Sequence, residues 1–269
     1  MNTGFDWIGW SAYGGFDLRT KQVQKELLEA MESSVILKAK TWSSHDGGAR
    51  IPYTYDDVAS AMDRGAPEFE AYFFGLGQGG SATVSVSRWP RVTAGCSGGV
   101  TAEETCAWCI TIDSVTRVLK PDISVVTIGL RLPSLESGQP TWDSQQQKTE
   151  ICMEYSMPAY NDYYRIGPRG LGTRTTFGPH YIEQFGRSLL LTTPVHVTEL
   201  DWGGVQLDLV EAPWNASMQD LAAAWRRGME HLTPAGIFAE LKIDEERKRI
   251  RYVKKGPNVV IGGVLPKEP

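Results

Sequence analysis

The sequence predicts an α+β protein, with a mixed, mainly antiparallel sheet packed by several helices and two similar-sized lobes in one compact unit. Two observations carry this prediction. β-forming runs come in pairs separated by short turns, which favours antiparallel strands. Amphipathic stretches with helix-capping signals lie between these pairs. We therefore expect a single domain over residues 1–269, with sub-lobes at 1–130 and 131–269 and a long irregular connection at 133–178.

The first half contains three helical patterns, which we expect at residues 21–31, 54–65 and 101–119. The third opens with a Thr-x-x-Glu capping box at Thr101, in which two side chains satisfy main-chain donors of the first turn. It must end before Pro121, because the residue before a proline is driven away from helical geometry. These signals predict both ends of the helix.

Strand patterns flank these helices. Residues 69–75 and 82–89 are rich in β-forming residues and predict an antiparallel hairpin. The glycine-rich stretch 75–80 between them lacks both the Gly-Lys-Ser/Thr signature and a following helix, so we interpret it as a turn and not as a phosphate loop. Residues 122–130 predict a strand with an apolar centre.

Regular patterns return after the irregular connection. We expect a short helical turn at 180–185, strands at 188–200 and 204–210, a helix at 218–231 and a terminal strand at 247–253. Either Asn215 or Ser217 can cap the helix, since both residue types are favoured at that position.

The composition is that of an ordinary globular protein, with 41% hydrophobic residues, 22% charged residues, a net charge of -5 and a pI near 5.5. A general nucleic-acid binder usually has a basic surface, so the acidic balance argues against that class. The N-terminus lacks a basic segment followed by an apolar run, and no stretch approaches the length that spans a bilayer. We expect a cytoplasmic protein with free thiols and no membrane partner.

Cys106 and Cys109 form a C-x-x-C motif with Trp108 between them. A zinc site needs two further ligands, and the remaining cysteines and histidines lack ligand-like spacing. A redox dithiol places its first cysteine at a helix N-terminus, whereas Thr101 caps this helix and Cys106 falls more than one turn inside it. We interpret both cysteines as lying at the margin of a buried helix face, and we expect no metal and no cofactor.

Gly95–Gly99 matches the G-x-S-x-G of a serine hydrolase elbow, with Ser97 as the nucleophile. That elbow needs a helix directly after the serine, and here the capping box delays the helix by several residues. Glu199 or Asp201 followed by His231 could complete a triad, but His231 is expected at a helix C-terminus, where the helix dipole favours it. The favoured interpretation is a loop of small residues before the helix cap.

Basic residues gather at 247–255 and at 165–174. Nucleic-acid binding would need them on one face with stacking aromatic residues nearby. The alternation in 247–253 instead predicts an edge strand whose charges block edge-to-edge pairing, and the acidic residues 244–246 partly neutralise it. We therefore do not expect a nucleic-acid partner.

The irregular connection is rich in tryptophan and tyrosine beside carboxylates. Such residues on a loop are typical anchors of a protein-contact surface, although they can equally pack as a lid over the sheet. On the first interpretation, the partner-contact residues are Trp142, Asp143, Tyr160, Asp162, Tyr163 and Tyr164.

The order of elements resembles the immunity protein 52 family, the antitoxins of bacterial polymorphic-toxin and type VI secretion systems. The most specific piece is VTRVLKPDISVVTIGL at residues 115–130, a helix broken at Pro121 that leads directly into a strand. An aromatic segment at 5–15, a helix and a hairpin precede it, and residues 189–238 resemble the closing strands and helix of the family. The tryptophan that usually follows the aspartate in the family is Ile123 here.

The resemblance implies neutralisation by tight binding in the cytoplasm of the producing cell or its kin, without catalysis or cofactor. We expect an immunity protein that binds and occludes a cognate secreted toxin. An acidic antitoxin would suit a basic toxin such as a nuclease, because complementary charge speeds association. The alternative is an enzyme, either a hydrolase that uses Ser97 or a thiol enzyme that uses Cys106 and Cys109.

Overall fold

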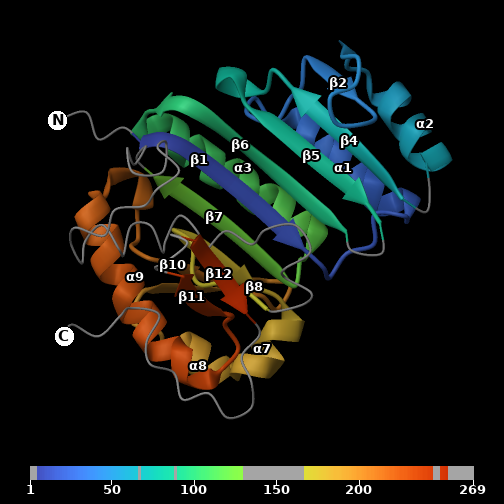
Figure 1. The fold of residues 1–269 in the computed structure, drawn as a ribbon. Coiled ribbons are helices and arrows are strands. Elements are labelled where there is room, and N and C mark those ends of the chain that lie inside the picture. Colours follow the sequence, from blue (N-terminus) through green and yellow to red (C-terminus); the bar gives the residue numbers. More distant parts are fainter. Residues whose placement is uncertain (1–4, 66–67, 88–89, 130–166, 245–248, 254–269) are drawn as a thin grey trace. The chain divides into compact units, whose positions relative to one another are not determined.

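The computed structural model describes residues 5–65, 68–87, 90–129, 167–244 and 249–253. Contacts within the chain define two compact units, with the boundary between Ser124 and Val125. Each unit combines helices with antiparallel strand pairs, which confirms the predicted α+β class (Figure 1). No helix within the described ranges is long and apolar enough to cross a membrane.

In the first unit the strands lie in the order β3, β2, β4, β5, β6, β1, and each is antiparallel to its neighbour. The predicted hairpin is the β4–β5 pair, and a 3₁₀ turn at Gly77–Gly79 lies between its strands. The strand bounds are β1 Phe5–Tyr13, β2 Thr41–Ser43, β3 Ile51–Pro52, β4 Phe69–Phe74, β5 Ser81–Val86 and β6 Arg91–Val100.

Helices α1 (Lys21–Ser33), α2 (Tyr55–Gly65) and α3 (Ala102–Leu119) confirm the helices predicted for the first unit. In Figure 1, α1 and α3 lie on one side of β4, β5, β6 and β1. The capping box is present: Thr101 Oγ1 accepts a hydrogen bond from Glu104 N at 3.2 Å, and Glu104 Oε2 accepts one from Thr101 N at 2.7 Å.

The end of α3 is fixed from two directions. Lys120 adopts the left-handed conformation (φ 48°), and Asp122 N then donates to Gly14 O at 3.2 Å. Gly15 has a φ of +73°, and a Cβ at this position would lie 2.5 Å from Lys120 O. Glycine is therefore required here both by the backbone conformation and by the close approach of the α3–β7 turn.

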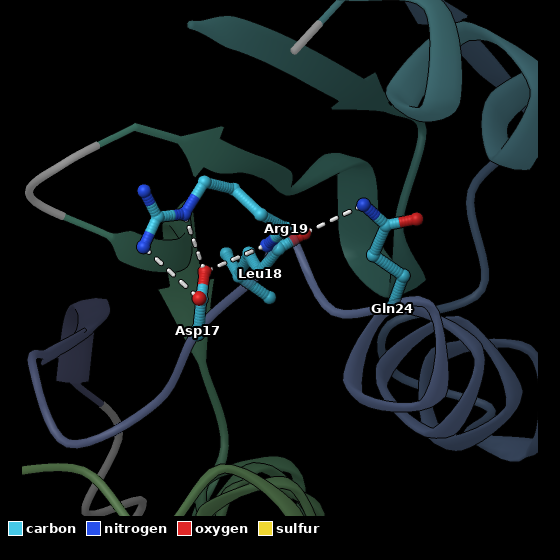
Figure 2. A network of polar contacts seen from close by, with 4 residues as sticks. All are labelled: Asp17, Leu18, Arg19 and Gln24. Carbon is cyan, nitrogen blue, oxygen red and sulfur yellow. Dashed lines mark hydrogen bonds and ion pairs between the residues drawn. The ribbon is translucent and has the colours of Figure 1, made fainter. Parts of the chain in front are cut away.

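A small polar network fixes the entry into α1 (Figure 2). Asp17 accepts hydrogen bonds from Arg19 Nε at 2.7 Å, Arg19 Nη2 at 3.0 Å and Arg19 N at 3.0 Å. The side-chain hydrogen bond from Arg19 is the main cause that lowers the pKa of Asp17. Gln24, one turn into the helix, donates to Leu18 O at 2.6 Å. These groups satisfy one another, so we assign the network a structural role.

The second unit begins within β7 (Ile123–Gly129), whose first two residues belong to the first unit. Across the sheet β7 is followed by β8, β10 and β9, and β11 pairs separately with β12. The remaining elements are β8 Arg174–Phe177, α7 Pro179–Phe185, α8 Arg187–Leu191, β9 His196–Glu199, β10 Val205–Asp208, α9 Met218–Leu232, β11 Glu240–Asp244 and β12 Arg249–Val253.

Two expectations for the second unit are wrong. Residues 188–191 were expected to begin a strand but belong to α8 (Arg187–Leu191), because Gly186 (φ +81°) ends α7 and lets a new helix start at once. Residues 174–177 were expected to be irregular but form β8. This strand is buried along its whole length and largely polar, so it lacks the apolar alternation by which a half-buried strand is found.

Each unit contains a fully buried tryptophan whose indole N–H has a specific acceptor. In the first unit Trp10 Nε1 donates to Ser124 Oγ at 2.8 Å. In the second unit Trp225 Nε1 donates to Leu171 O at 2.8 Å. A buried tryptophan usually needs such an acceptor, so these bonds fix the ring orientation in each core.

Candidate functional site

The two faces of the β4–β5–β6 sheet differ in chemistry. Side chains alternate between the faces of a strand. One set is apolar and buried, with Ala71, Phe73, Val84, Val92 and Ala94 among its members. The opposite set, which we call the polar face, consists of Glu70, Tyr72, Phe74, Ser81, Thr83, Ser85, Arg91, Thr93 and Gly95.

Strand register places the polar face in rows. One row contains Glu70, Ser85 and Arg91, the next Tyr72, Thr83 and Thr93, and the third Phe74, Ser81 and Gly95. Directly opposed Cβ atoms in antiparallel strands lie about 4.5–5.5 Å apart. The middle strand thus contributes only small hydroxyl side chains, and the large side chains stand on the flanking strands. In Figure 1 these strands lie in front of α1 and α3.

The first row is joined to the second by an ionic network. Tyr72 Oη donates a hydrogen bond to Glu70 Oε2, and Arg91 Nη2 lies 3.4 Å from Glu70 Oε1. Desolvation and then the hydrogen bond to Glu70 raise the pKa of Tyr72 to about 12. Its phenol is therefore a neutral donor at physiological pH, held in place by a carboxylate that Arg91 also contacts.

The β2–β3 loop borders the polar face on the β4 side. Ser43 Oγ donates to His45 O at 2.9 Å and so closes the start of this loop. The charge of Asp46 is a further cause of the raised pKa of Tyr72. Arg50 Cζ lies 3.9 Å from the ring centroid of Phe74, which is a cation–π contact. The face thus joins two aromatic side chains to two arginines.

This arrangement is suited to recognition. Its groups are a neutral phenol, an aromatic ring, guanidinium groups and small hydroxyls, all on a rigid antiparallel sheet. Metal binding would need a cluster of at least three His, Cys, Asp or Glu side chains, and none occurs among the residues that the structure describes.

Ser97 lies inside β6 (Arg91–Val100), so the expectation that it lies in a loop of small residues is wrong. Its register partner is Trp7, whereas Val100 pairs with Phe5, so β6 has one more residue than β1 in this interval. Gly98 and Gly99 absorb the extra residue with φ values of +115° and +92°. The G-x-S-x-G pattern is thus a strand that ends in a β-bulge, which bends a strand without starting a helix.

The proposed partners of Ser97 and the cysteines have local roles. His231 lies in the last turn of α9, and its Nε2 is 3.0 Å from the main-chain oxygen of Leu189 on α8. Cys109 is buried and Cys106 half-buried on α3, as their expected positions at the margin of the buried helix face predict, and neither is in a disulfide. Cys96 is buried as well: desolvation raises the pKa of its thiol, and the nearby Trp108 side chain acts in the opposite direction.

The structure does not place the partner-contact residues expected from the sequence. Trp142, Asp143, Tyr160, Asp162, Tyr163 and Tyr164 all lie outside the described residues. The polar face was not among the sites predicted from the sequence. Its signal was the alternation of polar with apolar residues in 69–74 and 81–86, which predicts strands with one polar face.

No protein-family model matches the chain, and no curated protein matches it. Among solved structures, the Pseudomonas aeruginosa T6SS protein PA0821 is similar, with a TM-score of 0.54 and 12% sequence identity over 87% of this chain and 73% of that chain. The duplicated taurocyamine kinase from Schistosoma mansoni aligns with a TM-score of 0.33 and 12% identity over 86% of this chain and 34% of the kinase. The first likeness shows a shared fold, and the second is too low to show one.

Proposed function

We propose that this chain is an immunity protein of a bacterial type VI secretion system, which binds a cognate toxin and blocks it. Two observations support the class of function. The order of elements resembles the immunity protein 52 family, and the fold is shared with a T6SS protein of Pseudomonas aeruginosa. Such a protein would act in the cytoplasm of the producing cell, during competition between bacteria.

The residues of the polar face support a binding role. Interface residues that contribute most to affinity are enriched in Tyr, Trp and Arg, and they lie in rigid, well-packed surroundings. Tyr72 and Arg91 are joined through Glu70, and Arg50 stacks on Phe74. Because these contacts form within the free protein, less side-chain ordering remains to be completed on binding, which favours affinity.

The toxin would be blocked by occlusion. A stable protein interface typically buries about 1,600 Å² in total. The rows of the polar face, together with the β2–β3 loop, place aromatic side chains around the exposed Ser81 and the half-buried Thr83. Tyr72, with a pKa of about 12, keeps its proton throughout the physiological range; because that proton is donated to Glu70, the phenol oxygen can accept a hydrogen bond from the toxin.

The direct test is co-expression with the toxin encoded beside the gene for this chain. We expect a stoichiometric complex and survival of the toxin-producing cell. Tyr72→Ala combined with Phe74→Ala should weaken the complex at least roughly tenfold, which corresponds to about 1.4 kcal/mol. Tyr55→Ala on α2, outside the polar face, is the matched aromatic control and should leave affinity unchanged.

The enzyme alternative predicts that Ser97→Ala, or a Cys106→Ser/Cys109→Ser double variant, no longer protects the cell. A binding role predicts instead that both variants protect the cell as well as the original protein does. Loss of protection in a folded variant of either kind would overturn a purely binding role. Absence of any complex with the toxin would overturn the immunity function itself.

A further inference from the structure

Glu70 joins a phenol and a guanidinium on the polar face. Its Oε2 accepts a hydrogen bond from Tyr72 Oη, and its Oε1 lies 3.4 Å from Arg91 Nη2. Tyr72 stands two residues further along β4, so its side chain lies on the same side of the strand as that of Glu70. The side chains of Glu70 and Arg91 are 31% and 16% exposed, so this network is partly shielded from water.

A buried hydroxyl beside this network has no partner. Ser85 lies between Glu70 and Arg91 in the register of the three strands, and it is 1% exposed. Directly opposed Cβ atoms are about 4.5–5.5 Å apart, so a glutamate side chain at position 70 can reach this hydroxyl. Ser85 Oγ nevertheless has no hydrogen-bond partner among the residues that the structure describes. Glu70 therefore binds Tyr72 while a buried donor opposite it stays unpaired.

This choice of partner favours a role in recognition over a role in stability. A polar group without a partner costs more free energy where water cannot reach it. Tyr72 is half-buried, so water can satisfy its phenol, whereas the buried Ser85 has no such alternative. A glutamate that only stabilised the sheet would accept its hydrogen bond from Ser85. The observed bond instead fixes a half-exposed phenol, and a group fixed in the free protein needs less ordering on binding.

The direction of the hydrogen bond determines what Tyr72 offers to a partner. A neutral phenol has one proton to donate and an oxygen that can also accept. The proton is donated to Glu70, so the oxygen remains for an incoming group. An N–H or O–H donor fits this oxygen, whereas a carbonyl or carboxylate would place two acceptors against each other.

We propose that Glu70 is a positioning residue for recognition on the polar face: it holds the proton of Tyr72, and the toxin group that meets Tyr72 is therefore a hydrogen-bond donor. This inference rests on the proposed immunity function and deepens it by naming the chemistry of the partner. Glu70 acts through Tyr72 and makes no separate contact with the toxin.

The free protein tests the positioning role. NMR of protein with ¹³C-labelled tyrosine follows the ionisation of Tyr72 with pH, and Tyr72→Phe assigns its signal. The hydrogen bond to Glu70 and the charge of Glu70 both raise the pKa of Tyr72, so Glu70→Gln should lower it. Glu103→Gln, which changes an exposed glutamate of α3, should leave it unchanged. An unchanged pKa in Glu70→Gln would overturn the proposal.

Toxin affinity tests whether Glu70 acts through Tyr72. Glu70→Gln and Tyr72→Phe should each weaken the complex roughly tenfold, about the effect of one lost hydrogen bond. The double variant should bind no more weakly than Tyr72→Phe alone, because two residues that act as one unit have non-additive effects. Additive losses would show that Glu70 contacts the toxin separately, which would overturn the proposal.

The unnatural amino acid p-aminophenylalanine at position 72 tests the direction of the hydrogen bond. Its amino group can donate to Glu70 as the phenol does, but its nitrogen is a poor acceptor. We expect toxin affinity as low as that of Tyr72→Phe. Affinity equal to that of the original protein would show that the toxin supplies an acceptor, and would overturn the proposal. Absence of any complex with the original protein would instead overturn the immunity function and the donor assignment with it, so the two failures are distinguishable.

Discussion

Replacement of Asp208 by asparagine tests how the second unit stabilises a charge in its interior. Asp208 Oδ1 accepts a hydrogen bond from Arg174 Nε at 2.5 Å, and its Oδ2 accepts one from Gln206 Nε2 at 2.9 Å. The side chains of Arg174 and Asp208 are only 8% and 3% exposed. Asparagine keeps the shape but has one acceptor oxygen, so its amide must point a donor at either Arg174 or Gln206.

The expected cost follows from burial. Arg174 cannot lose its proton, so Asp208→Asn removes the carboxylate that accepts the hydrogen bond from its buried Nε. Removal of one partner from a buried ion pair typically costs about 3–5 kcal/mol. Arg187 and Glu199 form an ion pair in the same unit with side chains 43% and 56% exposed, and pairs at such exposure contribute about 0–1 kcal/mol. Glu199→Gln is therefore the matched control.

Urea unfolding of the full-length protein, followed by tryptophan fluorescence, measures both variants. We expect Asp208→Asn to lower the free energy of unfolding by about 3–5 kcal/mol and Glu199→Gln to lower it by less than about 1 kcal/mol. Equal losses in the two variants would refute the argument, because burial would then not determine the strength of the charge pair.

Three further predictions concern the first unit. Thr101→Ala should lower the free energy of unfolding in urea by about 1 kcal/mol, because the first turn of α3 loses its capping oxygen; no loss would contradict the capping role. Gly15→Ala should lower the free energy of unfolding in urea more than Gly79→Ala does. Both glycines have positive φ, but only at Gly15 does a main-chain oxygen lie 2.5 Å from the added Cβ; equal losses would contradict the close approach. Desolvation and the hydrogen bond to Glu70 raise the pKa of Tyr72 to about 12, so folding favours its neutral form, and this stability is present below about pH 10 and lost as pH rises toward 12. Tyr72→Phe should flatten the fall of unfolding free energy between pH 10 and pH 11, and an unchanged slope would exclude Tyr72 as its source.

The elements that the sequence predicts well are those with local signals. Helix α3 has its start at Thr101 and its stop at Pro121, both within the element or next to it. The β4–β5 hairpin is similar, because its strands are joined by a short glycine-rich turn. In each case the residues that determine the structure are close in the chain, so a short window contains the whole signal.

The strands β6 and β8 were missed because their determinants are distant. β6 has glycines where a strand usually has β-branched residues, and its pairing with β1 depends on residues at the other end of the unit. β8 is a buried strand whose Arg174 is neutralised by Asp208 on β10. The polar face depends on the same information, because its rows exist only once β4, β5 and β6 are in register.

The pairing of β1 with β6 has a consequence for how this protein is made. β1 pairs Phe5 with Val100 and Tyr13 with Arg91, so it leaves the ribosome well before β6 and must wait for the rest of the unit to be synthesised before it finds its partner. The β4–β5 hairpin and the helices α1 and α2 are complete by then, with the edge that will receive β6 still unpaired. Contacts between distant residues are slow to form, and unpaired strand edges are sites of aggregation. A large fusion placed before Phe5 would therefore reduce the yield of folded protein more than a fusion of the same size in the β2–β3 loop.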